Sequence, residues 1–230
     1  MRYLLVLVIL VTGFGFVFPV TAQDADPAQR ALKYAEAQEK NLEALQTYSW
    51  KTRTEIAVNE TPMLTALIQA RFDTDGKLQH TTISSESHVE KKRGIRGKKQ
   101  KQKLEELGQL IEKVVRLQAS YAIMSKGQLV DLFEKATFED GTGDMKGMQK
   151  IHAKSVLVAN DELTVWVDPS TGLNRKLTIK TRLDEQTVVE GTIDYKTIKD
   201  GPTTASVSVL TIPSQGIGIR SERFDFIKQL

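Results

Sequence analysis

The C-terminal third of the chain, residues 163–226, has the pattern that most restricts the fold. Short runs in which apolar and polar side chains alternate are separated by segments rich in Gly, Pro and Asp. Such alternation is typical of strands with one buried face, and the intervening segments are typical of turns. The pattern predicts an antiparallel meander with one apolar face that the rest of the chain must cover. The alternating apolar positions are Leu163, Val165 and Val167; Leu177, Ile179 and Leu183; Val189, Ile193 and Tyr195; Ala205, Val207 and Val209; and Ile217 and Ile219.

The first 22 residues have the features of a secretory signal peptide. Arg2 supplies a positive start, residues 4–20 are apolar, and residues 20–22 (VTA) are typical of a cleavage site. We expect the mature chain to begin at Gln23 and to be periplasmic or secreted. The alternative is an uncleaved anchor helix. The apolar run is barely long enough to span a bilayer and contains two glycines and a proline, which favours cleavage.

The chain contains no cysteine. A lipid-modified N-terminal Cys and disulfides are therefore excluded, and stability must come from an apolar core. The remaining 208 or so residues suffice for a single domain, which we assign to residues 23–230. The 32 Lys and Arg nearly balance the 29 Asp and Glu, but eight basic residues and no acid lie within residues 91–103. Outside that tract the chain is mildly acidic.

The first part of the mature chain predicts one helix followed by three strands. Asp26 and Pro27 suit the N-cap and first position of a helix that continues to residue 46 with one apolar stripe. Alternation then predicts strands over residues 48–58, 64–72 and 78–84. We expect the chain to turn at Asn59-Glu60 and at Asp75-Gly76.

The middle of the chain has a different composition. Residues 91–103 are basic and poor in apolar side chains, which predicts a solvated loop or a frayed helix start. Helical spacing then predicts helices over residues 103–125 and 127–136, a helical insertion at about 103–136. Three glycines between residues 141 and 147 predict a flexible loop, and residues 148–158 predict one more strand.

This order of elements predicts the α+β class, with helices on one face of a large curved antiparallel sheet. The layout resembles that of the LolA/LolB-like superfamily of bacterial periplasmic proteins. The resemblance implies an unclosed half-barrel with an N-terminal helix and a central helical lid, enclosing a hydrophobic cavity for lipoprotein acyl chains. The chain lacks the Arg-Pro pair and the lipidated Cys found in parts of that family. The segments that carry the resemblance are 46–50 (QTYSW), 72–77 (FDTDGK), 166–172 (WVDPSTG) and 195–202 (YKTIKDGP).

Apolar side chains on the early strands and on the second helix are the candidate cavity lining. A cavity for acyl chains needs apolar walls with few hydrogen-bonding groups. A filled core needs the same residues, so the sequence leaves both interpretations open. The candidate lining residues are Trp50, Ile68 and Phe72 on the strands and Leu129, Leu132 and Phe133 on the lid.

The basic tract is the candidate contact with an anionic membrane surface. It has no interleaved aromatic residue for base stacking, so nucleic acid is not an expected partner. A solvated loop is the simpler interpretation of the same composition. The candidate membrane-surface residues are Lys91, Lys92, Arg93, Arg96, Lys98 and Lys99.

No catalytic or metal motif stands out. The three histidines, His80, His88 and His152, lack partners at metal-ligand spacing, and there is no Gly-x-Ser-x-Gly segment. We therefore expect no cofactor, no metal and no enzymatic activity. The leading hypothesis is a periplasmic carrier-like protein for lipid or acyl chains. The alternative is a regulatory or structural interaction protein with a filled core that binds a protein partner. A hydrolase with a dispersed site is a third and weaker hypothesis.

Overall fold

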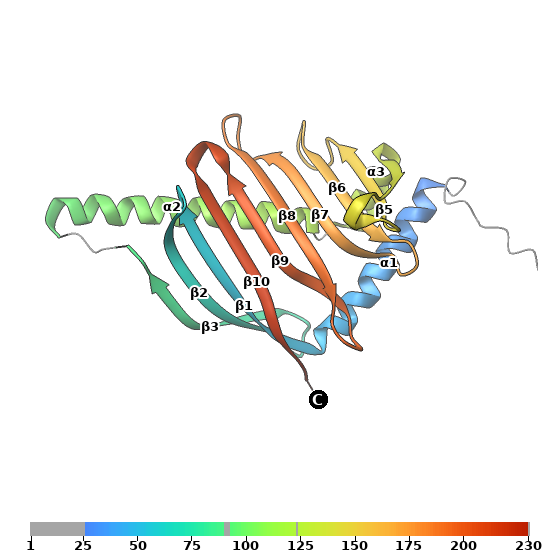
Figure 1. Cartoon of the computed structure of the whole chain (residues 1–230), viewed down its shortest axis with the longest axis horizontal. Coiled ribbons are helices and arrows are strands. Elements are labelled where there is room, and N and C mark those ends of the chain that lie inside the picture. Colours follow the sequence, from blue (N-terminus) through green and yellow to red (C-terminus); the bar gives the residue numbers. More distant parts are fainter. Residues whose placement is uncertain (1–25, 90–92, 123, 230) are drawn as a thin grey trace, which may run out of the picture.

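The computed structural model describes residues 26–89, 93–122 and 124–229 (Figure 1). The expected signal peptide lies outside this range. Over the described residues, ten strands form one antiparallel sheet in the order β3-β2-β1-β10-β9-β8-β7-β6-β5-β4, accompanied by three α-helices and two short 3-10 helices. The elements are α1 (Pro27–Gln46), β1 (Tyr48–Val58), β2 (Thr61–Phe72), β3 (Leu78–Ser87), α2 (Gly94–Ala122), α3 (Lys126–Lys135), β4 (Thr137–Asp140), η1 (Gly143–Met145), β5 (Gln149–Lys154), β6 (Glu162–Asp168), β7 (Leu173–Arg182), β8 (Val188–Thr197), β9 (Thr203–Ile212), η2 (Pro213–Gln215) and β10 (Ile217–Lys228).

The sheet is open, because β3 and β4 are its two edges and do not pair with each other. The helices lie against one face of it, α2 crossing one part of the sheet and α1 another (Figure 1). The predicted α+β fold, an unclosed antiparallel sheet with an N-terminal helix and central helices, is confirmed.

The N-terminal half follows the sequence prediction closely. α1 begins at Pro27, and the Asp26 side chain accepts a hydrogen bond from the Ala28 N–H as its N-cap. β1 and β2 meet at Asn59-Glu60, and both turn residues have positive φ, as the hairpin twist requires. Gly76 also has positive φ in the turn between β2 and β3.

α2 begins nine residues earlier than expected. The segment over residues 91–103, expected as a solvated loop or a frayed helix start, is helical from Gly94 onward, so only Arg93 of its described residues precedes the helix. Lys, Arg and Gln are good helix formers, and an exposed helix does not need an apolar stripe along its whole length. The scarcity of apolar residues therefore indicates a solvated part of the helix.

The loop region after α3 differs in detail from the prediction. It contains the short strand β4, which pairs with β5, and one turn of 3-10 helix, η1. The expected strand over residues 148–158 ends at Lys154. Residues 155–161 form a turn in which the Asp161 carboxylate accepts hydrogen bonds from three backbone N–H groups. The alternation was too short in β4 to indicate a strand.

Three apolar clusters cover the helix-facing side of the sheet. The first joins α1, α3 and the end of α2 to β5–β8, and the second joins the middle of α2 to β1 and β8–β10. The third joins the end of α1 to the starts of β1 and the ends of β2 and β10. α1 therefore contacts both the first and the third cluster, and it borders the region described next.

Candidate functional site

A groove of about 670 Å³ lies along one side of α1. The α1 residues that line it recur every three or four positions, so they share one face of the helix. The opposite wall comes from the turn after β6, the turn after β8, the start of β1 and the end of β10. The lining residues include Ala37, Lys40, Asn41, Ala44, Tyr48, Thr171, Leu173, Thr197, Gly201, Pro202 and Lys228.

The turn after β6 approaches α1 closely at Gly172. This residue has φ +71°, and a Cβ added there would lie 2.9 Å from the Ala37 Cβ. A side chain at this position would therefore be strained and would also push the turn away from the helix. The segment 166–172, which carried part of the family resemblance, forms this edge of the groove.

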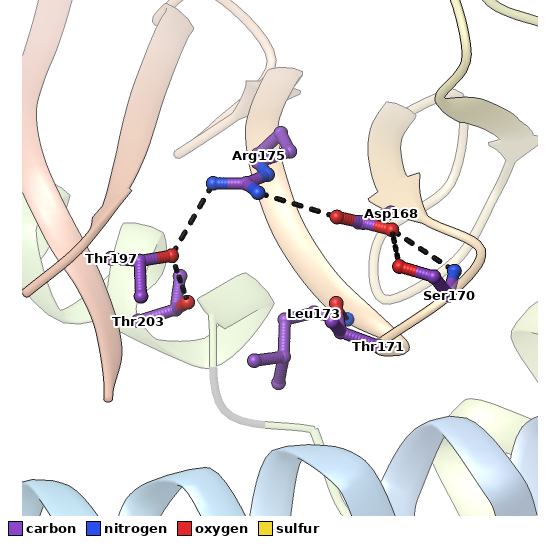
Figure 2. Close-up of polar contacts among 7 residues, drawn as sticks. All are labelled: Asp168, Ser170, Thr171, Leu173, Arg175, Thr197 and Thr203. Atoms are coloured by element: carbon purple, nitrogen blue, oxygen red, sulfur yellow. Dashed lines mark hydrogen bonds and ion pairs between the residues drawn. The ribbon is translucent and has the colours of Figure 1, made fainter. Parts of the chain in front are cut away.

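A chain of polar contacts holds the strand ends beside the groove (Figure 2). Arg175 pairs with Asp168 at 3.2 Å and donates to the Thr197 hydroxyl at 3.3 Å. The Thr197 and Thr203 hydroxyls lie 2.9 Å apart. Four adjacent strands, β6, β7, β8 and β9, are thereby tied together at the end where α1 crosses them. In Figure 2, Leu173 lies between this network and α1.

Asp168 is the acid of this network. Its carboxylate accepts hydrogen bonds from the Ser170 hydroxyl at 2.6 Å and the Ser170 N–H at 2.9 Å. Hydrogen bonding from Ser170 and the nearby Arg175 guanidinium hold the pKa of Asp168 below its ordinary value. Asp168 is thus a charged structural anchor for the turn and carries no sign of acid–base chemistry.

Three polar side chains of α1 fix the helix to the sheet. Asn41 donates to the Thr203 carbonyl and accepts from the Thr203 N–H, both at 2.7 Å. Gln38 donates to the Gly172 carbonyl at 2.9 Å, and the Tyr34 hydroxyl donates to the Asn174 side chain at 2.8 Å. These hydrogen bonds fix the position of α1 relative to the strand ends, and they therefore fix the two walls of the groove.

The six residues predicted to line a cavity fall into three places, and none of them lines this groove. Trp50 and Phe72 belong to the third cluster, where the Trp50 ring lies 5.8 Å from Phe72 and 6.4 Å from Phe226. Ile68 is partly exposed on β2 opposite Thr52. The lid residues Leu129, Leu132 and Phe133 are buried with α1 and β5–β7 in the first cluster.

The basic residues lie on the exposed start of α2. In Figure 1 this part of the helix extends beyond the sheet. Lys91 and Lys92 lie outside the described residues. The candidate membrane-surface residues that can be placed, Arg93, Arg96, Lys98 and Lys99, are all exposed.

The three histidines do not come together. His152 contacts Thr164 and His88 contacts Thr65, while His80 is exposed on β3. Over residues 26–89, 93–122 and 124–229, no three His, Asp or Glu side chains gather as a metal site. Within the same ranges, no helix has both the length and the apolar character needed to cross a membrane.

Sequence reasoning missed most residues of the groove. Ala37, Asn41 and Ala44 of α1 share one helical face with small or polar side chains, which looked like an ordinary exposed face. The segments 168–172 and 200–202 are among the Gly-, Pro- and Asp-rich segments expected to form turns, but nothing local shows that both meet α1. Only the 166–172 and 195–202 segments, noted for their resemblance, pointed to this region.

Comparison with known proteins finds likeness in structure alone. No family model matches the chain, and no curated protein matches it. Three solved structures are similar over most of its length. A DUF1329 family protein from Desulfovibrio piger has a TM-score of 0.42 and 10% identity, covering 90% of this chain and 95% of its own. A domain named for outer membrane lipoprotein sorting from Vibrio parahaemolyticus has a TM-score of 0.44 and 12% identity, covering 88% and 93%.

The third structure is a LolA superfamily protein from Nitrosomonas europaea, with a TM-score of 0.35 and 9% identity, covering 86% of this chain and 93% of its own. It belongs to the superfamily whose layout the sequence resembles. Likenesses of this strength concern the arrangement of strands and helices and carry no information about a ligand.

Proposed function

We propose that the protein binds a hydrophobic ligand, a lipid or an acyl chain, in the groove along α1, and that it acts as a periplasmic, carrier-like protein without catalytic activity. The observation that carries this proposal is the groove itself. Its volume of about 670 Å³ falls within the range of roughly 300–1,000 Å³ typical of ligand sites. Small and apolar side chains such as Ala37, Ala44, Leu173 and Pro202 line much of it.

The shape of the groove suits an elongated ligand. Its α1 wall spans Ala37 to Ala44, two turns of helix, and presents alanines to the interior. Lys40 and Lys228 also line it, and long lysine side chains cover apolar surface with their methylenes while the ammonium stays in water. An apolar chain would lie along the helix with its polar end near water.

The predicted cavity residues then act indirectly. Leu129, Leu132 and Phe133 pack with Ala31 and Ala35 of α1, and Trp50 packs in the cluster that contains Leu45 at the end of α1. We propose that both sets position α1, and therefore the groove wall, without touching the ligand. The basic start of α2 would bring the protein to an anionic membrane surface.

The test is to fill the groove. Ala44→Trp places an indole on its α1 wall, while Glu36→Trp adds the same ring to an exposed position of α1 outside it. We expect Ala44→Trp to weaken the binding of a fluorescent fatty acid about tenfold or more, a loss of about 1.4 kcal/mol, and Glu36→Trp to leave it unchanged. Equal affinities in the two variants would contradict the proposed site.

A second candidate function is protein interaction through the sheet. All ten residues of β3 are exposed, and β3 is an edge strand with one side unpaired. An exposed edge can accept a strand of a partner. The burial of Trp50, Leu129, Leu132 and Phe133 in packed clusters also suits the filled core of this alternative. Purified protein that is bare of lipid, takes up no fatty acid and captures a partner through β3 would favour it.

A further inference from the structure

β9 and β10 separate before they end. They pair from Ile212 and Ile217 as far as Val207 and Glu222. Beyond that point β9 still pairs with β8, and β10 still pairs with β1, but β9 and β10 no longer pair with each other. The sheet therefore forks, and residues 203–206 and 223–228 border the fork from its two sides. A bulge in β9 between the partners of Asp194 and Tyr195 accompanies the separation.

Two basic side chains, those of Arg223 and Lys196, lie beside this fork. Arg223 donates to the Thr204 hydroxyl at 3.3 Å, and its guanidinium carbon lies 5.3 Å from the centre of the Trp50 ring. Lys196 donates to the Arg223 carbonyl at 3.4 Å, and its ammonium lies 5.3 Å from the centre of the Phe226 ring. Aromatic faces hold both cations in place.

Neither cation is neutralised by an acid in the part of the chain that the structure describes. Neighbouring lysines do have such partners: Lys51 pairs with Asp225 and Lys176 with Asp194. For the Arg223 guanidinium, Thr204 is the one acceptor among the described residues, although a guanidinium carries five N–H donors. Both side chains retain contact with solvent, since Arg223 is partly exposed and Lys196 is exposed.

Burying part of a positive charge costs free energy unless an anion pairs with that charge. Burial lowers the pKa of the Arg223 guanidinium, but an arginine stays protonated at neutral pH. The Trp50 ring lies over one face of the guanidinium. Apart from the hydrogen bond to Thr204, this leaves the N–H groups at the edge of the guanidinium without an acceptor among the described residues. That edge matches two oxygens of a carboxylate or a phosphate.

We propose that the fork between β9 and β10 is a binding site for an oxoanion, a carboxylate or a phosphate group, held by Arg223 and Lys196. The anion is either the head group of a lipid or fatty acid, or a free ion such as phosphate. The proposal goes beyond hydrophobic-ligand binding and does not depend on it, because the contacts at the fork involve none of the residues that line the groove.

Calorimetry with three probes separates these cases: laurate, the uncharged lauryl alcohol with the same chain, and inorganic phosphate. The exported protein is compared with Arg223→Gln, Lys196→Gln and the control Arg220→Gln, an exposed arginine of the same strand. We expect Arg223→Gln and Lys196→Gln to weaken laurate binding about tenfold without changing that of lauryl alcohol. Arg220→Gln should change neither.

A third outcome is that the protein binds phosphate, with the same dependence on Arg223 and Lys196, but binds neither laurate nor lauryl alcohol. That outcome identifies the ligand of the fork as a free oxoanion. It supports the fork and contradicts the hydrophobic-ligand proposal. Laurate and phosphate affinities that are unchanged in both fork variants, or no binding of either anion by the wild-type protein, overturn the fork site. Thermal unfolding checks each variant. If Arg223→Gln does not fold, the test of the fork site rests on Lys196→Gln, because Lys196 is exposed and its substitution should not disturb the fold.

Discussion

Asp161 is the residue whose carboxylate organises the turn between β5 and β6. It is 1% exposed, and it accepts hydrogen bonds from the N–H groups of Val156, Leu157 and Val158 at 2.6–2.9 Å. The Tyr121 hydroxyl donates to it at 2.5 Å, and this hydroxyl also contacts Thr181. One side chain therefore joins a turn of the sheet to the end of α2.

Removal of this carboxylate should strongly destabilise the fold. Asp161→Ala leaves the Tyr121 hydroxyl and three backbone donors without their acceptor, so we expect the free energy of unfolding at neutral pH to fall by about 3 kcal/mol. Urea denaturation measures it. Asp131→Ala, at an exposed position of α3, is the control and should cost less than about 1 kcal/mol. Similar losses in both variants would contradict the structural role of Asp161.

Asp168 gives a pH dependence whose sign follows from its pKa. Hydrogen bonds from Ser170, together with Arg175, lower the pKa of Asp168 in the folded state. Its contribution to stability is therefore present above the unfolded pKa of about 3.9 and is lost as the pH falls through the lower folded pKa. Asp168→Asn should be less stable than wild type at pH 7, and the difference should shrink below about pH 4. A difference that does not change with pH in denaturation measured from pH 7 to pH 3 would rule this out.

The element that defines the groove is α1, and its contact with the turn after β6 is the closest point. Gly172 has φ +71° and lies against Ala37, whereas Gly147 has φ +85° with no atom within 4 Å of an added Cβ. Gly147→Ala therefore measures the cost of the backbone conformation alone, about 1 kcal/mol. We expect Gly172→Ala to cost more, by about 1–2 kcal/mol, because the added methyl also clashes with α1. Equal losses in thermal unfolding would show that the turn can move away from the helix.

A second prediction for a single element concerns the basic start of α2 and its binding to anionic membranes. Arg96→Gln, Lys98→Gln and Lys99→Gln together remove three exposed charges, each worth about 1 kcal/mol near an anionic surface. Binding to vesicles that contain phosphatidylglycerol should weaken about 100-fold at low salt, and less at high salt.

The matched control removes three exposed lysines elsewhere, at Lys33, Lys77 and Lys199. This triple variant has the same net charge and should bind the vesicles nearly as well as wild type. Co-sedimentation compares them. Equal weakening in the two triple variants would mean that net charge, and not the α2 surface, governs the attraction.

The elements could be predicted from local patterns where those patterns are long. α1, the hairpin of β1 and β2, and the meander of β6–β10 combine clear periodicity with Asn-Glu, Asp-Gly or Asp-Gly-Pro turns, so their type and order follow from the sequence. For the start of α2 the sequence left a loop and a frayed helix start open, because a solvated stretch of helix has no apolar stripe that would distinguish it from a loop. β4 was missed because four residues are too few to show an alternation.

At the scale of the whole molecule, the groove brings together parts of the chain that are far apart in sequence. Ala44 and Leu173 face the same space although 129 positions separate their residue numbers. Nothing local in either segment indicates the other. Trp50, Leu129, Leu132 and Phe133, which the sequence offers as candidate lining residues, are buried, but a filled core and a cavity wall require the same side chains. Only the three-dimensional arrangement distinguishes them.

The most direct test of the account is native mass spectrometry of the exported protein, purified without detergent and then extracted with organic solvent. The groove along α1 predicts close to one co-purifying lipid or fatty acid per chain, lost in Ala44→Trp and retained in Glu36→Trp. Bare wild-type protein that also takes up no fluorescent fatty acid would contradict a hydrophobic-ligand function.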